Sequence, residues 1–177
     1  MKTARYLLAS LLSVAAIVTT VDAQPAARPS PPASVTATID GAAVKLDYSR
    51  PSMKGRKIWG ELVPFDKEWR TGANEATTIT FAQPMVVGGA DVPAGAYTLW
   101  TVPKADGSAK LVINKQTGQW GTNYSAAQDL VRVDLKKTDV AQPVEQFLMA
   151  VEPTAGGGGV LKMTWDKTEY SVALKKK

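Results

Sequence analysis

The chain contains no histidine and no cysteine among its 177 residues. Without these two residue types there can be no Ser-His-Asp triad, no Cys-His pair, no zinc site of the usual kind and no structural disulfide. A metal ion would have to bind carboxylates and carbonyl oxygens alone, and no Asp-rich loop of the calcium-binding pattern is present. We therefore expect no metal, no cofactor, and a fold that depends on its core and its hydrogen bonds.

Long helical patterns and blocks of one charge are also missing. No segment of ten or more residues repeats its apolar positions with a helical period. The formal net charge is +5, and three of the positive charges are the last three residues, 175–177. The other charges are mixed in sign, which argues against a nucleic-acid partner.

The N-terminus has the pattern of a secretory signal, which we place at residues 1–23. Lys2 and Arg5 precede an apolar run, 6–20, that is short for a membrane span, and small residues stand at positions 21 and 23 before a cleavage site. A membrane anchor is the alternative interpretation. The signal predicts a periplasmic or secreted protein that is not inserted in the membrane after cleavage.

The remaining residues predict a linker and one domain. Residues 24–33 are rich in Pro and Ala and predict an extended linker, and residues 34–177 are enough for a single core. Apolar and polar residues alternate there in short segments spaced about 8–12 residues apart, with turn pairs such as Asp40-Gly41 and Asp166-Lys167 between them. This pattern predicts an all-β, antiparallel β-sandwich or jelly-roll-like fold with nine or ten short strands. The expected strands are residues 35–39, 44–48, 79–81, 84–87, 96–102, 110–114, 130–135, 144–151, 160–165 and 169–174.

Two irregular stretches, 48–81 and 115–128, concentrate arginine, asparagine and tryptophan. Planar guanidinium groups suit carboxylates, phosphates and sugar hydroxyls, and tryptophan rings stack on sugar faces or on a peptide partner. These residues predict an exported, non-catalytic binding domain for a polar or anionic ligand such as an envelope glycan. The predicted ligand site consists of Arg50, Arg56, Trp69, Arg70, Asn74, Glu75 and Trp120.

A structural interpretation of the same residues stays open. The nearby acids Glu61, Asp66, Glu68 and Glu75 could pair with the three arginines and fix a long loop to the sandwich. The rings of Trp59 and Trp69 could likewise be tucked beneath that loop.

Two further functions remain possible at this point. The first is a hydrolase in which Glu75 acts with a second carboxylate, for which Glu61, Asp66 and Asp129 are candidates. The second is a structural or protein-interaction domain of the cell envelope, which would present an apolar patch or an unpaired edge strand.

Several longer motifs resemble one bacterial family, the domain of unknown function family 2911. The resemblance covers about residues 35–174 and implies an exported, periplasmic or secreted domain of Gram-negative bacteria. It implies no activity, substrate or catalytic residue. The motifs are Ser49-Arg50-Pro51, Lys54-Gly55-Arg56, Ile58-Trp59-Gly60, the run from Trp69 to Thr77, and the run from Pro93 to Leu99.

Overall fold

The computed structural model of the chain describes residues 28–177, so the predicted signal and residues 24–27 of the predicted linker lie outside the described part. The described residues form nine strands and one short 3-10 helix, and every strand pairing is antiparallel, which confirms the predicted all-β class. None of the helical structure within residues 28–177 has the length and apolar character to cross a membrane. The elements are β1 (Pro32–Ile39), β2 (Ala42–Ser49), β3 (Thr78–Phe81), β4 (Met85–Val87), β5 (Ala90–Val92), β6 (Gly95–Pro103), β7 (Ala109–Asn114), η1 (Ala126–Gln128), β8 (Asp129–Pro153) and β9 (Gly159–Lys176).

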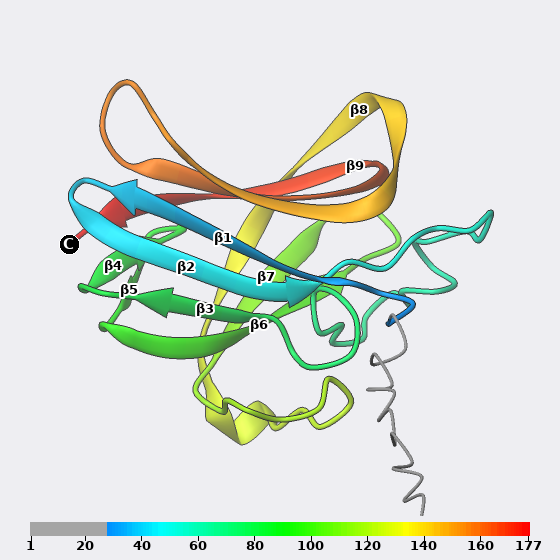
Figure 1. Cartoon of the computed structure of the whole chain (residues 1–177), viewed down its shortest axis with the longest axis horizontal. Helices are drawn as coiled ribbons and strands as arrows, with labels where there is room; N and C mark the ends of the chain where they lie inside the picture. The colour runs from blue at the N-terminus through cyan, green and yellow to red at the C-terminus, as the bar shows by residue number, and fades with distance from the viewer. Residues whose placement is uncertain (1–27) are drawn as a thin grey trace, which may run out of the picture.

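The strands follow the order β1-β2-β3-β6-β7-β8-β9-β4-β5 and fold into two layers (Figure 1). The long strand β8 belongs to both layers. Its residues 129–135 pair with β7, and most of its residues from 136 to 153 pair with β9. The sheet therefore turns back on itself through β8, and it does not close into a barrel.

Some predicted turns are absent. Strand β9 runs unbroken through Asp166-Lys167, where we expected a hairpin turn, and residues 130–151 likewise belong to one strand. Asp166 adopts a left-handed φ of 51°, and the register of β8 shifts opposite it. The turn-type residue therefore makes an irregularity of the β-bulge kind, which bends the strand without ending it. A short strand, β5, also occupies Ala90–Val92, which is not among the expected strands.

The core lies between the layers and contains the strand positions that alternate inward. Val44 and Leu46 of β2 face it beside Phe81 and Ile79 of β3, and Trp165 of β9 is buried there. Trp100 belongs to a second, smaller cluster. Because Tyr97 and Leu99 of β6 face the main core, Trp100 lies on the opposite face, where it packs with Ala76, Val112 and Tyr124.

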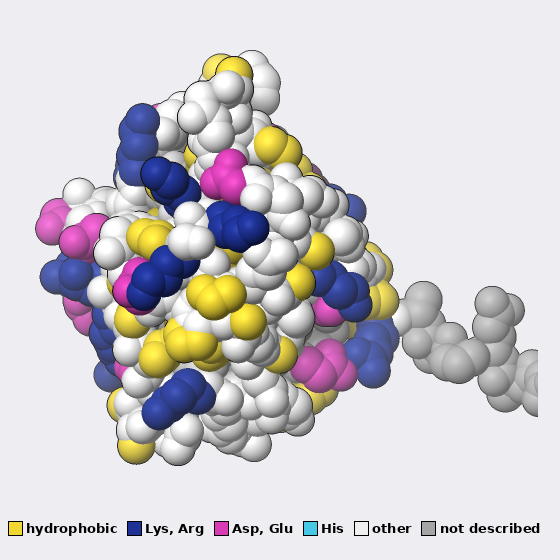
Figure 2. Space-filling view, turned by 90° about the vertical axis from the view of Figure 1, so that its left-hand side faces the viewer, with side chains coloured by type: hydrophobic (Ala, Val, Ile, Leu, Met, Phe, Trp, Pro, Cys, Tyr) yellow, Lys and Arg dark blue, Asp and Glu magenta, His cyan; other side chains and the backbone are white. Residues whose placement is uncertain are grey.

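Two inserts leave the sheet. The first insert, residues 50–77, connects β2 to β3, and the second insert, residues 115–128, connects β7 to β8 (Figure 1). The backbone joins them, because Gly121 N donates to Asn74 O at 3.0 Å and Ala76 N donates to Gln119 O at 3.4 Å. The end of the molecule away from the first insert shows basic, acidic and hydrophobic side chains interspersed (Figure 2).

Candidate functional site

The first insert is held against both layers by backbone hydrogen bonds. Met53 N donates to Glu145 O at 2.8 Å, and Phe147 N donates to Pro51 O at 2.9 Å. On the other layer, Trp69 and Thr101 exchange hydrogen bonds of 2.9 and 2.8 Å. An insert anchored at these points keeps a fixed shape, although it contains no helix and no long strand.

Residues of the first insert form most of the lining of a cavity of about 240 Å³, which we name the insert cavity. Four of the seven predicted site residues line it, namely Arg56, Trp69, Arg70 and Asn74. The remaining lining residues are Ser30, Pro51, Leu62, Val63, Gly72, Ala73 and Trp165. The side chains combine two positive charges with apolar walls, and no carboxylate is among them.

Arg70 is the residue of the insert cavity whose polar groups are least satisfied. Its side chain forms no hydrogen bond and no ion pair with any residue from 28 to 177, and its Nε is buried without an acceptor there. Burial alone lowers the pKa of its guanidinium. The side chain passes directly beneath the second insert, where a Cβ on Gly121 would overlap Arg70 Cδ. Buried guanidinium donors normally have acceptors, so this arginine lacks a partner that it would ordinarily have.

The other two predicted arginines donate to backbone carbonyls. Arg56 Nε donates to Met53 O at 2.9 Å and its Nη2 donates to Ser52 O at 2.6 Å, so part of its fork is already engaged. Arg50 Nε donates to Phe147 O at 3.1 Å, and Arg50 does not line the insert cavity. Arg50 therefore helps to fix the insert on β8.

The alternative interpretation, in which these arginines pair with nearby acids, is not observed. Instead, Glu61 pairs with Lys57 at 3.2 Å, Glu68 pairs with Arg132 at 3.1 Å and Glu75 pairs with Arg28 at 2.9 Å. Within residues 28–177, Arg50, Arg56 and Arg70 have no carboxylate partner at all. The self-paired interpretation of the three arginines is therefore wrong for the described part of the chain.

The tryptophans divide between packing and exposure. Trp69 stacks on Trp165 with ring centroids 5.7 Å apart, donates its Nε1 to Gly72 O at 3.0 Å, and still forms a wall of the insert cavity. Trp59 meets the edge of Trp69 at 6.0 Å. Both rings thus lie beneath their own insert, as the structural interpretation expected. Trp120 is 51% exposed and does not line the insert cavity.

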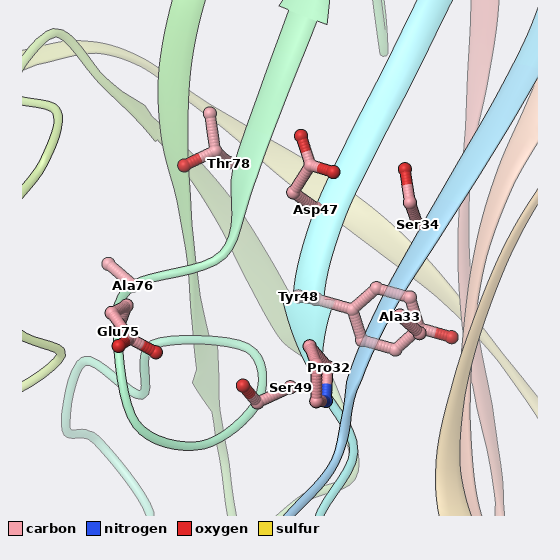
Figure 3. A pocket seen from close by; sticks show the side chains of 9 residues that line it. All are labelled: Pro32, Ala33, Ser34, Asp47, Tyr48, Ser49, Glu75, Ala76 and Thr78. Atoms are coloured by element: carbon pink, nitrogen blue, oxygen red, sulfur yellow. The ribbon is translucent and has the colours of Figure 1, made fainter. Parts of the chain in front are cut away.

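Glu75 lines a second hollow, of about 440 Å³, which we name the outer hollow (Figure 3), whereas its neighbour Asn74 lines the insert cavity. Ser34, Asp47 and Thr78 form a cross-strand row over β1, β2 and β3, and Glu75 lies on the loop beside them. Tyr48, Ser49, Pro32, Ala33 and Ala76 complete the lining.

The two carboxylates of the outer hollow are already bonded. Glu75 accepts hydrogen bonds from Arg28 Nη1 on both oxygens, at 2.9 and 3.0 Å, and its own backbone N–H and Arg28 lower its pKa. Desolvation acts in the opposite direction at Asp47, but hydrogen bonds from Lys45 and Ser34 leave its pKa lowered. A general acid needs a raised pKa, so neither carboxyl group is set up to donate a proton. Among residues 28–177, His, Cys, Asp and Glu form no group of three that could hold a metal ion.

The acids that we considered as partners of Glu75 are engaged elsewhere or lie outside the outer hollow. Glu61 is paired with Lys57, and Asp129 belongs to a network on the second insert. Asp47, which shares the hollow with Glu75, was not predicted as a site residue. Its alternating position on a strand indicated only a solvent-facing side chain.

Sequence reasoning also missed that network, which we name the Asp129 network. Asp129 accepts hydrogen bonds from Tyr124 at 2.7 and 2.8 Å, from Arg132 Nε at 2.9 Å and from Asn114 at 2.8 Å. Arg132 Nη2 also donates to Glu68 at 3.1 Å, and so ties the first insert to β8. The sequence shows that Tyr124 is an aromatic residue of the second insert, but no local pattern indicates that Asp129 and Arg132 bind its hydroxyl.

The chain belongs to the family described as "Protein of unknown function (DUF2911)", whose model matches residues 30–174. The match confirms the family that the sequence motifs indicated. Neither the curated proteins nor the solved structures contain a match to this chain.

Proposed function

We propose that this member of the family is a non-catalytic binding domain for a small polar or anionic ligand, and that the insert cavity is its binding site. The observation that supports this proposal is Arg70, a half-buried arginine that lines the cavity and whose Nε is buried without an acceptor in residues 28–177. Holding an unpaired charge away from water costs free energy. An anionic ligand in the cavity would supply a counter-charge, and acceptors for the terminal nitrogens of the guanidinium.

The rest of the lining supports the same ligand chemistry. The cavity has two guanidinium groups and no carboxylate, so its charge favours an anion. Trp69, Leu62 and Val63 add apolar walls, which suit the flat face of a sugar ring. At about 240 Å³ the cavity is smaller than pockets for drug-sized ligands, which measure roughly 300–1,000 Å³. One unit of an envelope glycan is the size of ligand that fits.

The proposed binding site contains fewer residues than the sequence predicted. Arg56, Trp69, Arg70 and Asn74 remain as binding residues, whereas Arg50 fixes the insert and Glu75 faces the outer hollow. We propose that the domain is exported to the periplasm or secreted, where glycans of the cell envelope would be its ligands.

The test is calorimetric titration of the protein with a panel of small carboxylates, phosphates, sulfates and neutral sugars. The variant Arg70→Gln should lose binding of the best ligand, because it removes the charge and keeps a polar side chain. Lys57→Gln is the matched control, since Lys57 is an exposed cation of the same insert that pairs with Glu61 outside the cavity. Binding that survives Arg70→Gln, or a panel in which nothing binds, would contradict the proposal.

A further inference from the structure

Part of the lining of the insert cavity comes from a turn of backbone next to Arg70 in the sequence. Gly72, Ala73 and Asn74 all line the cavity, and the first two are buried. None of their three backbone N–H groups donates to an acceptor within residues 28–177. More than nine in ten buried backbone N–H groups in proteins are paired, so consecutive unpaired groups in one cavity wall are unusual.

The conformation of this turn suits an anion. The chain bends at residues 71–74, and Asn74 has a left-handed φ of 59°. Successive backbone N–H groups in a turn can form a concave anion-binding surface. Asn74 is one of the residue types that accept a left-handed φ at low cost. Its side chain is used elsewhere, because Nδ2 donates to Ser30 O at 3.1 Å.

We infer that the turn at Gly72–Asn74 and the guanidinium of Arg70 together hold one oxyanion, and that this oxyanion is the carboxylate of a sugar acid. The inference rests on the proposed function and specifies its ligand. The guanidinium would donate two parallel hydrogen bonds to the carboxylate, as arginine forks do. The backbone N–H groups would donate to the oxygen lone pairs that the fork leaves open.

Three features favour a carboxylate over a phosphate dianion. Arg70 is the only cavity arginine whose fork is entirely without acceptors in the described chain, since Arg56 donates twice to backbone carbonyls. No lysine lines the cavity. The Trp69 wall offers a ring face beside the anion, and the volume of about 240 Å³ suits a single ring. A monoanion attached to one ring therefore matches both the charge and the space.

The experiment compares D-galacturonate with D-galactose, which share the ring and differ in carrying a carboxylate or a hydroxymethyl group. Inorganic phosphate is the third probe. Affinities come from calorimetry, and the backbone amide resonances of residues 72–74 are followed by ¹H–¹⁵N NMR in the same titrations. Galacturonate should bind at least about tenfold more tightly than galactose, because a charge-assisted pair is gained. The amide resonances of residues 72–74 should move with saturation.

Arg70→Gln should weaken galacturonate binding by at least about tenfold and leave galactose unchanged, whereas Lys57→Gln should change neither. Amide dispersion in the NMR spectra shows whether each variant is folded. Arg70-dependent binding of phosphate without binding of galacturonate would overturn the sugar acid and leave the proposed function standing. If galacturonate binds but the amide resonances of residues 72–74 do not shift, the proposed role of the turn is overturned. No Arg70-dependent binding of any of the three probes would overturn the whole inference, and the wider panel would then decide the proposed function.

Discussion

Arg70 and Arg132 both contact the second insert, and their surroundings are opposite. Arg132 donates to Asp129, Glu68 and Tyr124, and these contacts raise the pKa of its guanidinium against the opposing effect of desolvation. Arg70 lies against Gly121 with no acceptor in the described chain, and burial lowers its pKa.

The difference shows how one insert serves two purposes. Glu68 is only two positions from Arg70 in the sequence, yet it pairs with Arg132 on β8. The acid that could have neutralised Arg70 instead holds the insert in place. A satisfied network gives stability, whereas an unsatisfied cation in a fixed cavity keeps its donors for a ligand.

The largest effect should come from Arg132→Met. This change leaves the carboxylates of Glu68 and Asp129 without their cation, and the Asp129 side chain is only 16% exposed. We expect a loss of about 2 kcal/mol in the free energy of unfolding, between the values for exposed and buried pairs. Urea unfolding measures it. Lys57→Met, at an exposed pair, is the control and should stay within about 0.5 kcal/mol. Equal stabilities for the two variants would show that the network is dispensable.

A smaller loss should follow Tyr124→Phe, about 1 kcal/mol at neutral pH, because the hydroxyl bonded to Asp129 is removed. Burial, and next the hydrogen bond to Asp129, raise the pKa of Tyr124 above its ordinary value of 10. A raised folded-state pKa means that its stabilisation is present below pH 10 and is lost as the pH rises through the folded pKa. Stability of the parent protein should therefore fall more steeply above pH 10 than that of the variant. Tyr97 and Tyr170 titrate in both proteins, so parallel curves would count against the assignment.

The smallest effect, and one of opposite sign, should come from Arg70→Met. The substitution breaks no hydrogen bond within residues 28–177 and removes a partly desolvated charge. Stability should stay level or rise by about 0.5 kcal/mol while ligand binding is lost, the trade-off expected of a binding residue. Thermal unfolding in the absence of ligand measures the change. If Arg70→Met lowered the free energy of unfolding as much as Arg132→Met does, Arg70 would be a structural residue like Arg132, and the prediction would be wrong.

The strands could be predicted from the sequence wherever one face of the strand is buried and the other is exposed to solvent. Val44 and Leu46 alternate with polar neighbours, and β2 forms there because period-two alternation places both on the core side. Asp166 misled the prediction because a residue suited to a turn can also sit in a bulge, and only the pairing of β9 with β8 decides between the two. Local composition does not contain that information.

The candidate site was predictable only where its residues are close together in the sequence. Arg56, Trp69, Arg70 and Asn74 are close in sequence, and an insert that folds back on itself brings them together. The pairing of Glu68 with Arg132 spans 64 positions, and Arg28 reaches Glu75 across 47. Such pairings depend on which segments the fold places side by side, so no local sequence motif predicts them.

The sharing of β8 by both layers also determines the order in which the molecule can assemble. Strand β9 lies between β8 and β4, so the pair formed by β4 and β5 is not joined to the rest of the sheet until β9 is in place. Pairings of such long sequence separation make folding slow, because the intervening loops must close first. A nascent chain that has not yet released β9 carries an unprotected strand edge, and its second layer can close only after β9 has been synthesised.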